Sequence, residues 1–93
     1  MKWISDVYKY AFEHLTPEEE RCARMCESMV VYGSELGGYS DKTYLKQYRK
    51  SLGDERVEEI YNILKKFIDE KCQIVPNTFQ DDEGVTYNGV AWR

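Results

Sequence analysis

Residues 54–71 read DERVEEIYNILKKFIDEK, and this stretch contains the strongest structural signal in the chain. Its apolar side chains recur at spacings of three and four residues, which is the period of one face of an α-helix. These side chains are Val57, Ile60, Tyr61, Leu64, Phe67 and Ile68. The pattern predicts a helix over residues 54–71 that buries this face against other parts of the chain.

A second helix is predicted over residues 17–32. It begins after Thr16, whose side chain can accept from the first free amides, while proline at position 17 suits the first helical turn. Glu19 stands three residues after Thr16, the spacing of a capping box. Gly33 follows the last residue of the pattern and offers the left-handed conformation in which many helices end. Both ends of this helix therefore have a signal of their own.

Two more helices are predicted from apolar spacing. Residues 3–15 show the helical rhythm, and residues 41–52 repeat it before Gly53. The apolar members of the first are Ile4, Val7, Tyr8, Ala11, Phe12 and Leu15, and those of the second are Leu45, Tyr48 and Leu52. We expect both helices to pack on those over residues 17–32 and 54–71.

The pattern changes after Cys72, where turn residues separate short apolar stretches. Asn88-Gly89 is the strongest short hairpin signal and predicts a β-hairpin over residues 84–92. A competing turn at Asp81 to Gly84 would instead pair residues 74–79 with the chain from Val85 onward. In either case the expected fold is mainly α: a four-helix single domain over residues 1–93, closed by a C-terminal extended segment or β-hairpin.

Length and composition limit the class of protein. The chain of 93 residues has room for one domain, and its 42% hydrophobic content is that of an ordinary globular protein. No stretch approaches the roughly 18 apolar residues of a membrane span, and no apolar signal segment is seen at the start. The three cysteines are an odd number and fit reduced thiols. We therefore expect a cytoplasmic protein with no membrane contact.

Trp3, Tyr10 and His14 would form an aromatic stripe beside the apolar face of the helix over residues 3–15. With Val7 they take the spacing of side chains that anchor a helix in a partner's groove, and Trp and Tyr are enriched at binding hot spots. The alternative is that a wide arc of the helix is simply buried in the core. The sequence leaves both interpretations open.

A basic face is predicted on the helix over residues 41–52. It consists of Lys42, Lys46, Arg49 and Lys50, and it could contact the phosphates of a nucleic acid or a nucleotide. Tyr44 and Tyr48 are expected on the buried side of this helix, away from the charges. The net charge of −4 opposes general attraction to nucleic acid. A solvated surface is the plainer interpretation.

Neither metal binding nor catalysis has a specific motif. Cys22 and Cys26 share a helical face, and with Cys72 and His14 they would make a zinc-compatible ligand set, but buried cysteines are common in cores. The chain has one histidine, no glycine-rich phosphate loop and no nucleophile motif. We therefore expect no metal, no cofactor and no enzymatic activity.

The expected function is that of a small protein-interaction module acting stoichiometrically on a larger protein or protein–nucleic acid complex. An accessory protein of a phage or other mobile element that inhibits a host nuclease or defence complex is one instance. Acidic groups would then imitate a nucleic-acid backbone: Glu18, Glu19 and Glu20, the group from Glu55 to Glu59, and Asp81, Asp82 and Glu83. Self-assembly into a homo-oligomer remains open, as does the nucleic-acid or nucleotide-binding alternative.

Overall fold

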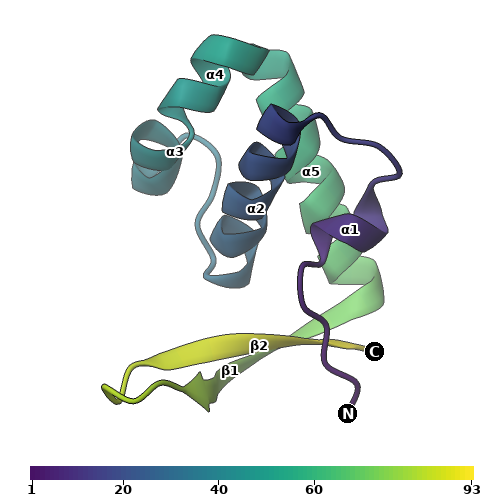
Figure 1. Cartoon of the computed structure of the whole chain (residues 1–93), viewed down its shortest axis with the longest axis vertical. Coiled ribbons are helices and arrows are strands. Elements are labelled where there is room, and N and C mark those ends of the chain that lie inside the picture. Colours follow the sequence, from purple (N-terminus) through teal and green to yellow (C-terminus); the bar gives the residue numbers. More distant parts are fainter.

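The computed structural model describes all residues 1–93 and contains five helices followed by a two-stranded antiparallel sheet (Figure 1). The helices are α1 (Tyr8–Ala11), α2 (Pro17–Val31), α3 (Tyr39–Tyr44), α4 (Lys46–Leu52) and α5 (Asp54–Lys71), and the strands are β1 (Cys72–Gln80) and β2 (Thr86–Trp92). The helices form one layer, and the hairpin lies across one end of it. The prediction of a mainly α fold with a C-terminal hairpin is confirmed in part: the chain is rich in helix, but it has five helices where four were predicted.

Helices α2 and α5 form the centre of the molecule, and both match their predicted ranges to within one residue. The capping box at the start of α2 is present: the Thr16 hydroxyl accepts from the amide of Glu19 at 3.2 Å, and the Glu19 carboxylate accepts from the amide of Thr16 at 2.9 Å. The largest fully buried side chains are Leu45, Ile60, Leu64 and Ile68. Burial of this apolar surface is the main force that holds the helices together.

The helix predicted over residues 3–15 is wrong for most of that range. Only Tyr8–Ala11 is helical, because Asp6 takes a left-handed conformation with φ 55° and Phe12 is extended. The apolar side chains of the segment nevertheless face the core, with Val7 and Tyr8 buried and the others packed against the buried cluster. The helical period therefore identified the buried side chains correctly and the backbone incorrectly.

Residues 2–4 are extended because they pair with β2. The amide of Ile4 donates to the carbonyl of Val90 at 2.8 Å, and the amide of Trp92 donates to the carbonyl of Lys2 at 2.9 Å. Trp3 is bridged antiparallel to Ala91 between these two bonds. The sheet edge thus satisfies backbone groups that would otherwise bond within a helix, and the N-terminal segment extends the sheet beyond β2.

The helix predicted over residues 41–52 is divided into α3 and α4 at Leu45. This residue is fully buried, and its amide donates to the carbonyl of Asp41 at 3.0 Å. The bend at Leu45 lets α3 lie at an angle to α4 (Figure 1). As a result the two halves present different faces to solvent, which changes the expected positions of the basic and aromatic residues.

The hairpin uses the competing turn, and the predicted turn at Asn88-Gly89 is wrong. Asp81 bonds to Val85 through its backbone amide and its side chain: the amide of Asp81 donates to the Val85 carbonyl at 3.0 Å, and its Oδ1 accepts from the Val85 amide at 2.9 Å. Gly84 has φ 85°, a conformation that glycine adopts readily. Asn88 and Gly89 instead lie inside β2, where Gly89 pairs with Val75.

Asn88 has a structural role that explains its position within the strand. Its Nδ2 donates to the carbonyl of Val31 at 3.1 Å, and its backbone amide donates to the hydroxyl of Tyr32 at 3.1 Å. Val31 is the last residue of α2, whose terminal carbonyls lack helical partners. Asn88 therefore attaches the hairpin to the end of α2.

No helix in the structure is both long and apolar enough to cross a bilayer.

Candidate protein-interaction surface

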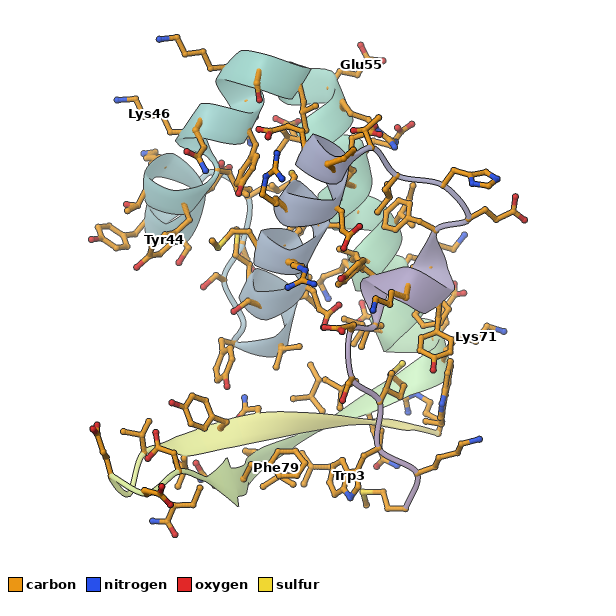
Figure 2. The ribbon with its side chains drawn as sticks, viewed as in Figure 1. Trp3, Tyr44, Lys46, Glu55, Lys71 and Phe79 are labelled. Carbon is orange, nitrogen blue, oxygen red and sulfur yellow. The ribbon has the colours of Figure 1, made fainter.

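The two rings of Trp3 and Phe79 lie together on the side of the sheet that faces away from the helices (Figure 2). Their centroids are 5.4 Å apart and the rings meet edge to face at 63°. Both are solvent-exposed, at 42% for Trp3 and 49% for Phe79. The two rings together leave apolar area in contact with water that a partner could cover.

The indole of Trp3 packs directly on the backbone of Gly89. A Cβ atom built on Gly89 would lie 2.6 Å from Cζ3 of Trp3 and 3.0 Å from Cε2 of Phe79. No side chain fits there, so the absence of one allows both rings to approach the backbone of β2. Both rings therefore pack against the backbone of β2 at Gly89.

Tyr87 extends this surface toward the turn. It is the direct cross-strand partner of Phe79 and is 44% exposed. Its hydroxyl donates to Oδ2 of Asp81 at 3.0 Å, which connects the ring to the turn. We call Trp3, Phe79 and Tyr87 the aromatic patch. Sequence reasoning selected only Trp3; the signal for Phe79 was its place opposite Tyr87 if the chain turned at Asp81 to Gly84.

The aromatic stripe of Trp3, Tyr10 and His14 does not exist as predicted. Tyr10 packs edge to face on Trp92 at 5.2 Å, and Trp92 projects from the opposite side of the strand to Ala91, the residue bridged to Trp3. His14 is exposed in the connection between α1 and α2. Because the segment is not one helix, the three side chains fall in three separate places.

The predicted basic face is incomplete, because Arg49 is engaged within the molecule. It forms a two-bond ion pair with Asp41 at 2.7 Å for each bond and also contacts Asp54 at 3.0 Å and Glu58 at 2.7 Å. The guanidinium of Arg49 lowers the pKa of Asp41 below its ordinary value. Asp41 is buried, so this pair stabilises the α3–α4 bend, and most of the N–H groups of Arg49 already donate to carboxylates of the chain itself.

The three lysines Lys42, Lys46 and Lys50 are exposed, and a tyrosine joins two of them. Tyr48 is buried as predicted, but Tyr44 is 49% exposed, which corrects its expected burial. A hollow of about 440 Å³ is lined by Met25, Thr43, Tyr44, Lys46, Gln47 and Lys50. The bend at Leu45 turns Tyr44 outward, and a single-helix assumption could not have found this arrangement.

Most of the acidic residues predicted to imitate nucleic acid are paired within the molecule. Glu18 accepts from Arg21 and Ser51, Glu19 from Arg56 and the Thr16 amide, and Glu20 lies near Arg24 and the Tyr8 hydroxyl. In the second group, Glu58 bonds to Arg49 and Glu59 to Arg56. Glu55, Asp82 and Glu83 are exposed with no ion pair, whereas the Asp81 side chain accepts bonds within the turn. Those three are the carboxylates free to meet a partner.

The cysteines and the histidine are not assembled into a metal site. No group of three or more His, Cys, Asp or Glu side chains has the geometry to hold an ion. Cys22 and Cys26 are buried neighbours on α2, with their Sγ atoms 4.0 Å apart, and Cys72 is buried at the start of β1. Burial and the neighbouring Cys22 sulfur raise the pKa of Cys26 above its ordinary value, which favours the unreactive thiol.

Comparison of the chain with protein-family models, curated proteins and solved structures found no match.

Proposed function

We propose that this chain is a protein-interaction module that acts stoichiometrically, without catalysis, and that the aromatic patch is its main contact surface. The observation that supports this proposal is the exposed Trp3–Phe79 pair on a sheet face that no helix covers. Trp and Tyr are the residues most enriched among those whose truncation costs binding energy. A partner that covered the rings would remove their apolar area from water.

The way in which the rings are held favours binding over simple packing. Trp3 packs on the backbone of Gly89 and against the ring of Phe79, and these two contacts limit the positions open to its indole. A side chain that is already fixed loses little conformational entropy when a partner covers it, so more of the burial energy remains as affinity. An exposed but fixed ring is therefore better suited to recognition than a mobile one.

The proposal is tested by comparing two exposed aromatic residues on different surfaces. Phe79→Ser removes one ring of the patch, and Tyr39→Ser removes a ring on α3 that is 78% exposed. Both variants and the unaltered chain would be used as baits with native cell extract, and the bound proteins quantified by mass spectrometry. We expect a partner that is lost with Phe79→Ser and retained with Tyr39→Ser. Equal recovery with both variants would refute the assignment of the patch.

A narrower form of the proposal is inhibition of a host nuclease or defence complex by a protein of a phage or another mobile element. The free carboxylates Glu55, Asp82 and Glu83 would then meet Arg or Lys side chains of the target. Reversal of these three charges should weaken binding to a captured nuclease, and the loss should diminish as salt increases. Unchanged affinity at low salt would exclude this form and leave the broader proposal intact.

A second candidate function is binding of a nucleotide or single-stranded nucleic acid at the hollow beside Tyr44. The exposed ring lies with Lys46 and Lys50, and a ring beside basic groups can stack on a base while the lysines meet phosphate. The test is fluorescence anisotropy with a labelled single-stranded oligonucleotide across a salt series, using Lys46→Glu with Lys50→Glu and, as a control, Lys66→Glu on α5. Salt-dependent binding lost only in the first variant supports this function; no binding at low salt excludes it.

A further inference from the structure

The sheet and its turn carry charges only at their two ends. Among residues 1–4 and 72–93 the acidic side chains are Asp81, Asp82 and Glu83, all at the turn, and the basic side chains are Lys2 and Arg93. Figure 1 shows both termini at one end of the hairpin and the turn at the other. The aromatic patch lies on the uncharged strands between them. The sheet is therefore acidic at one end, apolar in the middle and basic at the other end.

The backbone bonds fix the basic end. Lys2 accepts from the amide of Trp92 through its carbonyl, and the amide of Arg93 donates to the carbonyl of Lys71 at 3.0 Å. The Arg93 guanidinium donates to the backbone carbonyl of Asp69 at 3.1 Å, while the carboxylate of Asp69 pairs with Lys65 at 2.7 Å, so Arg93 forms no ion pair within the chain. At the turn, Asp82 and Glu83 form no ion pair. No lysine or arginine lies among residues 72–92, so nothing in the hairpin offsets their charge.

We propose that the partner on the aromatic patch is a second copy of this chain, packed face to face with its sheet running in the opposite direction. The inference rests on the proposed function, because it names the occupant of the same surface. Two-fold symmetry places the same patch on both sides of such a contact. Each Trp3–Phe79 pair then covers its equivalent, at the spacing of about 10 Å at which sheets stack.

Charge determines the direction of the two-fold axis. If the axis ran along the strands, turn would meet turn and the carboxylates of Asp82 and Glu83 would face their own copies. If the axis runs across the strands, the acidic turn of each copy meets Lys2 and Arg93 of the other. Like charges across an interface are unfavourable and opposite charges favourable, so the second arrangement is selected.

The test measures self-association by sedimentation velocity across the micromolar range at low salt. Asp82→Lys with Glu83→Lys makes both ends of the sheet basic, and Lys2→Glu with Arg93→Glu makes both ends acidic. We expect each double variant alone to dimerise about tenfold more weakly than the unaltered chain. An equimolar mixture of the two should dimerise again, and so should a fourfold variant that exchanges the charges within one chain. Tyr39→Ser is the matched control and should dimerise normally.

Three results would overturn the inference. One is an unaltered chain that stays monomeric throughout the range. Another is a dimer that survives Phe79→Ser, which would place the contact elsewhere. The third is failure of both the mixture and the fourfold variant to regain association, which would exclude the antiparallel arrangement. In each case the bait experiment gives a separate result. A protein that the unaltered chain captures from the extract and the Phe79→Ser variant does not would still support the proposed function. Failure of the dimer and failure of the proposed function are therefore distinguishable.

Discussion

Gly89 lies directly beneath the indole of Trp3, so close that a Cβ atom on Gly89 would stand 2.6 Å from Cζ3. This contact joins the N-terminal segment to the middle of β2. Since the backbone of Gly89 is part of the strand, a Cβ atom there would have to displace the side chains of Trp3, Phe79 and Thr78.

Gly89→Ala should lower the free energy of unfolding by about 1–3 kcal/mol, the usual cost of inserting a methyl group into a filled space. The measurement is urea unfolding followed by circular dichroism. The same substitution made in a Trp3→Ala background should cost less, because the nearest clashing atoms are gone. An identical cost in both backgrounds would mean that Trp3 is not what occupies the space.

Arg49→Leu should destabilise the fold by about 3–5 kcal/mol, because it leaves the buried carboxylate of Asp41 without its ion-pair partner. Lys46→Leu on the same helix is the control and should change stability by less than about 0.5 kcal/mol, since Lys46 is exposed. Chemical denaturation at neutral pH measures both. Similar effects of the two substitutions would show that the Asp41–Arg49 pair is dispensable.

The same pair predicts a loss of stability in acid. The pKa of Asp41 is lower in the folded chain than in the unfolded chain, so its stabilisation is complete above about pH 4. It is lost as the pH falls through the lowered folded value, because the unfolded chain then binds the proton more readily. Unfolding measured from pH 2 to pH 6 should show this decline, and Asp41→Asn should reduce its slope.

Glu27 predicts a pH dependence of the opposite sign. Burial raises the pKa of its carboxyl above the ordinary value, even though its Oε1 accepts from the amide of Tyr8 at 2.8 Å. A raised folded pKa means that the contribution to stability is greatest below the unfolded value and is lost as the pH rises through the folded one. Glu27→Gln keeps an acceptor for Tyr8 and removes the charge. It should therefore flatten the loss of stability above about pH 4.5; an unchanged profile would contradict this origin.

The three thiols should be protected from reagents in the folded state. Cys22, Cys26 and Cys72 are all buried; the hydrogen bond with Cys22 and burial raise the pKa of Cys26, and burial raises that of Cys72. Labelling with a thiol-specific chromogenic disulfide should be slow in buffer and rapid in denaturant, because both attack and ionisation need solvent access. Rapid labelling of one thiol in buffer would identify a site that opens locally.

The helices α2 and α5 were predictable because each carries its own local signals. The capping box at Thr16 and Glu19 and the regular apolar face after Asp54 act within a few residues along the chain. The core side chains of the N-terminal segment were predictable for the same reason. Its backbone was not, because the pairing of Trp3 with Ala91 joins residues at opposite ends of the sequence.

The candidate surface was only partly predictable. Trp3 was selected for the right residue type but on a helix that does not form, and Phe79 depended on a choice between two turns. Asn88-Gly89 resembled a turn because both residues tolerate unusual conformations, yet Asn88 is retained for its bonds to α2 and Gly89 for the space it leaves. Asn and Gly are the residue types that a tight turn prefers, and they are also the types that the contacts of β2 with α2 and Trp3 require. The contacts, and not the turn preference, determined the structure at these two positions.

The pairing of residues 2–4 with β2 has a consequence for the order of folding. Contacts that join distant parts of a chain pay a larger loop-closure entropy than contacts between neighbours and form more slowly. Helices α2 and α5 and the hairpin can form from nearby residues, whereas the N-terminal segment must wait for β2. We therefore expect Trp3 to reach its position on Gly89 in the last phase of folding, after the helices and the hairpin have formed.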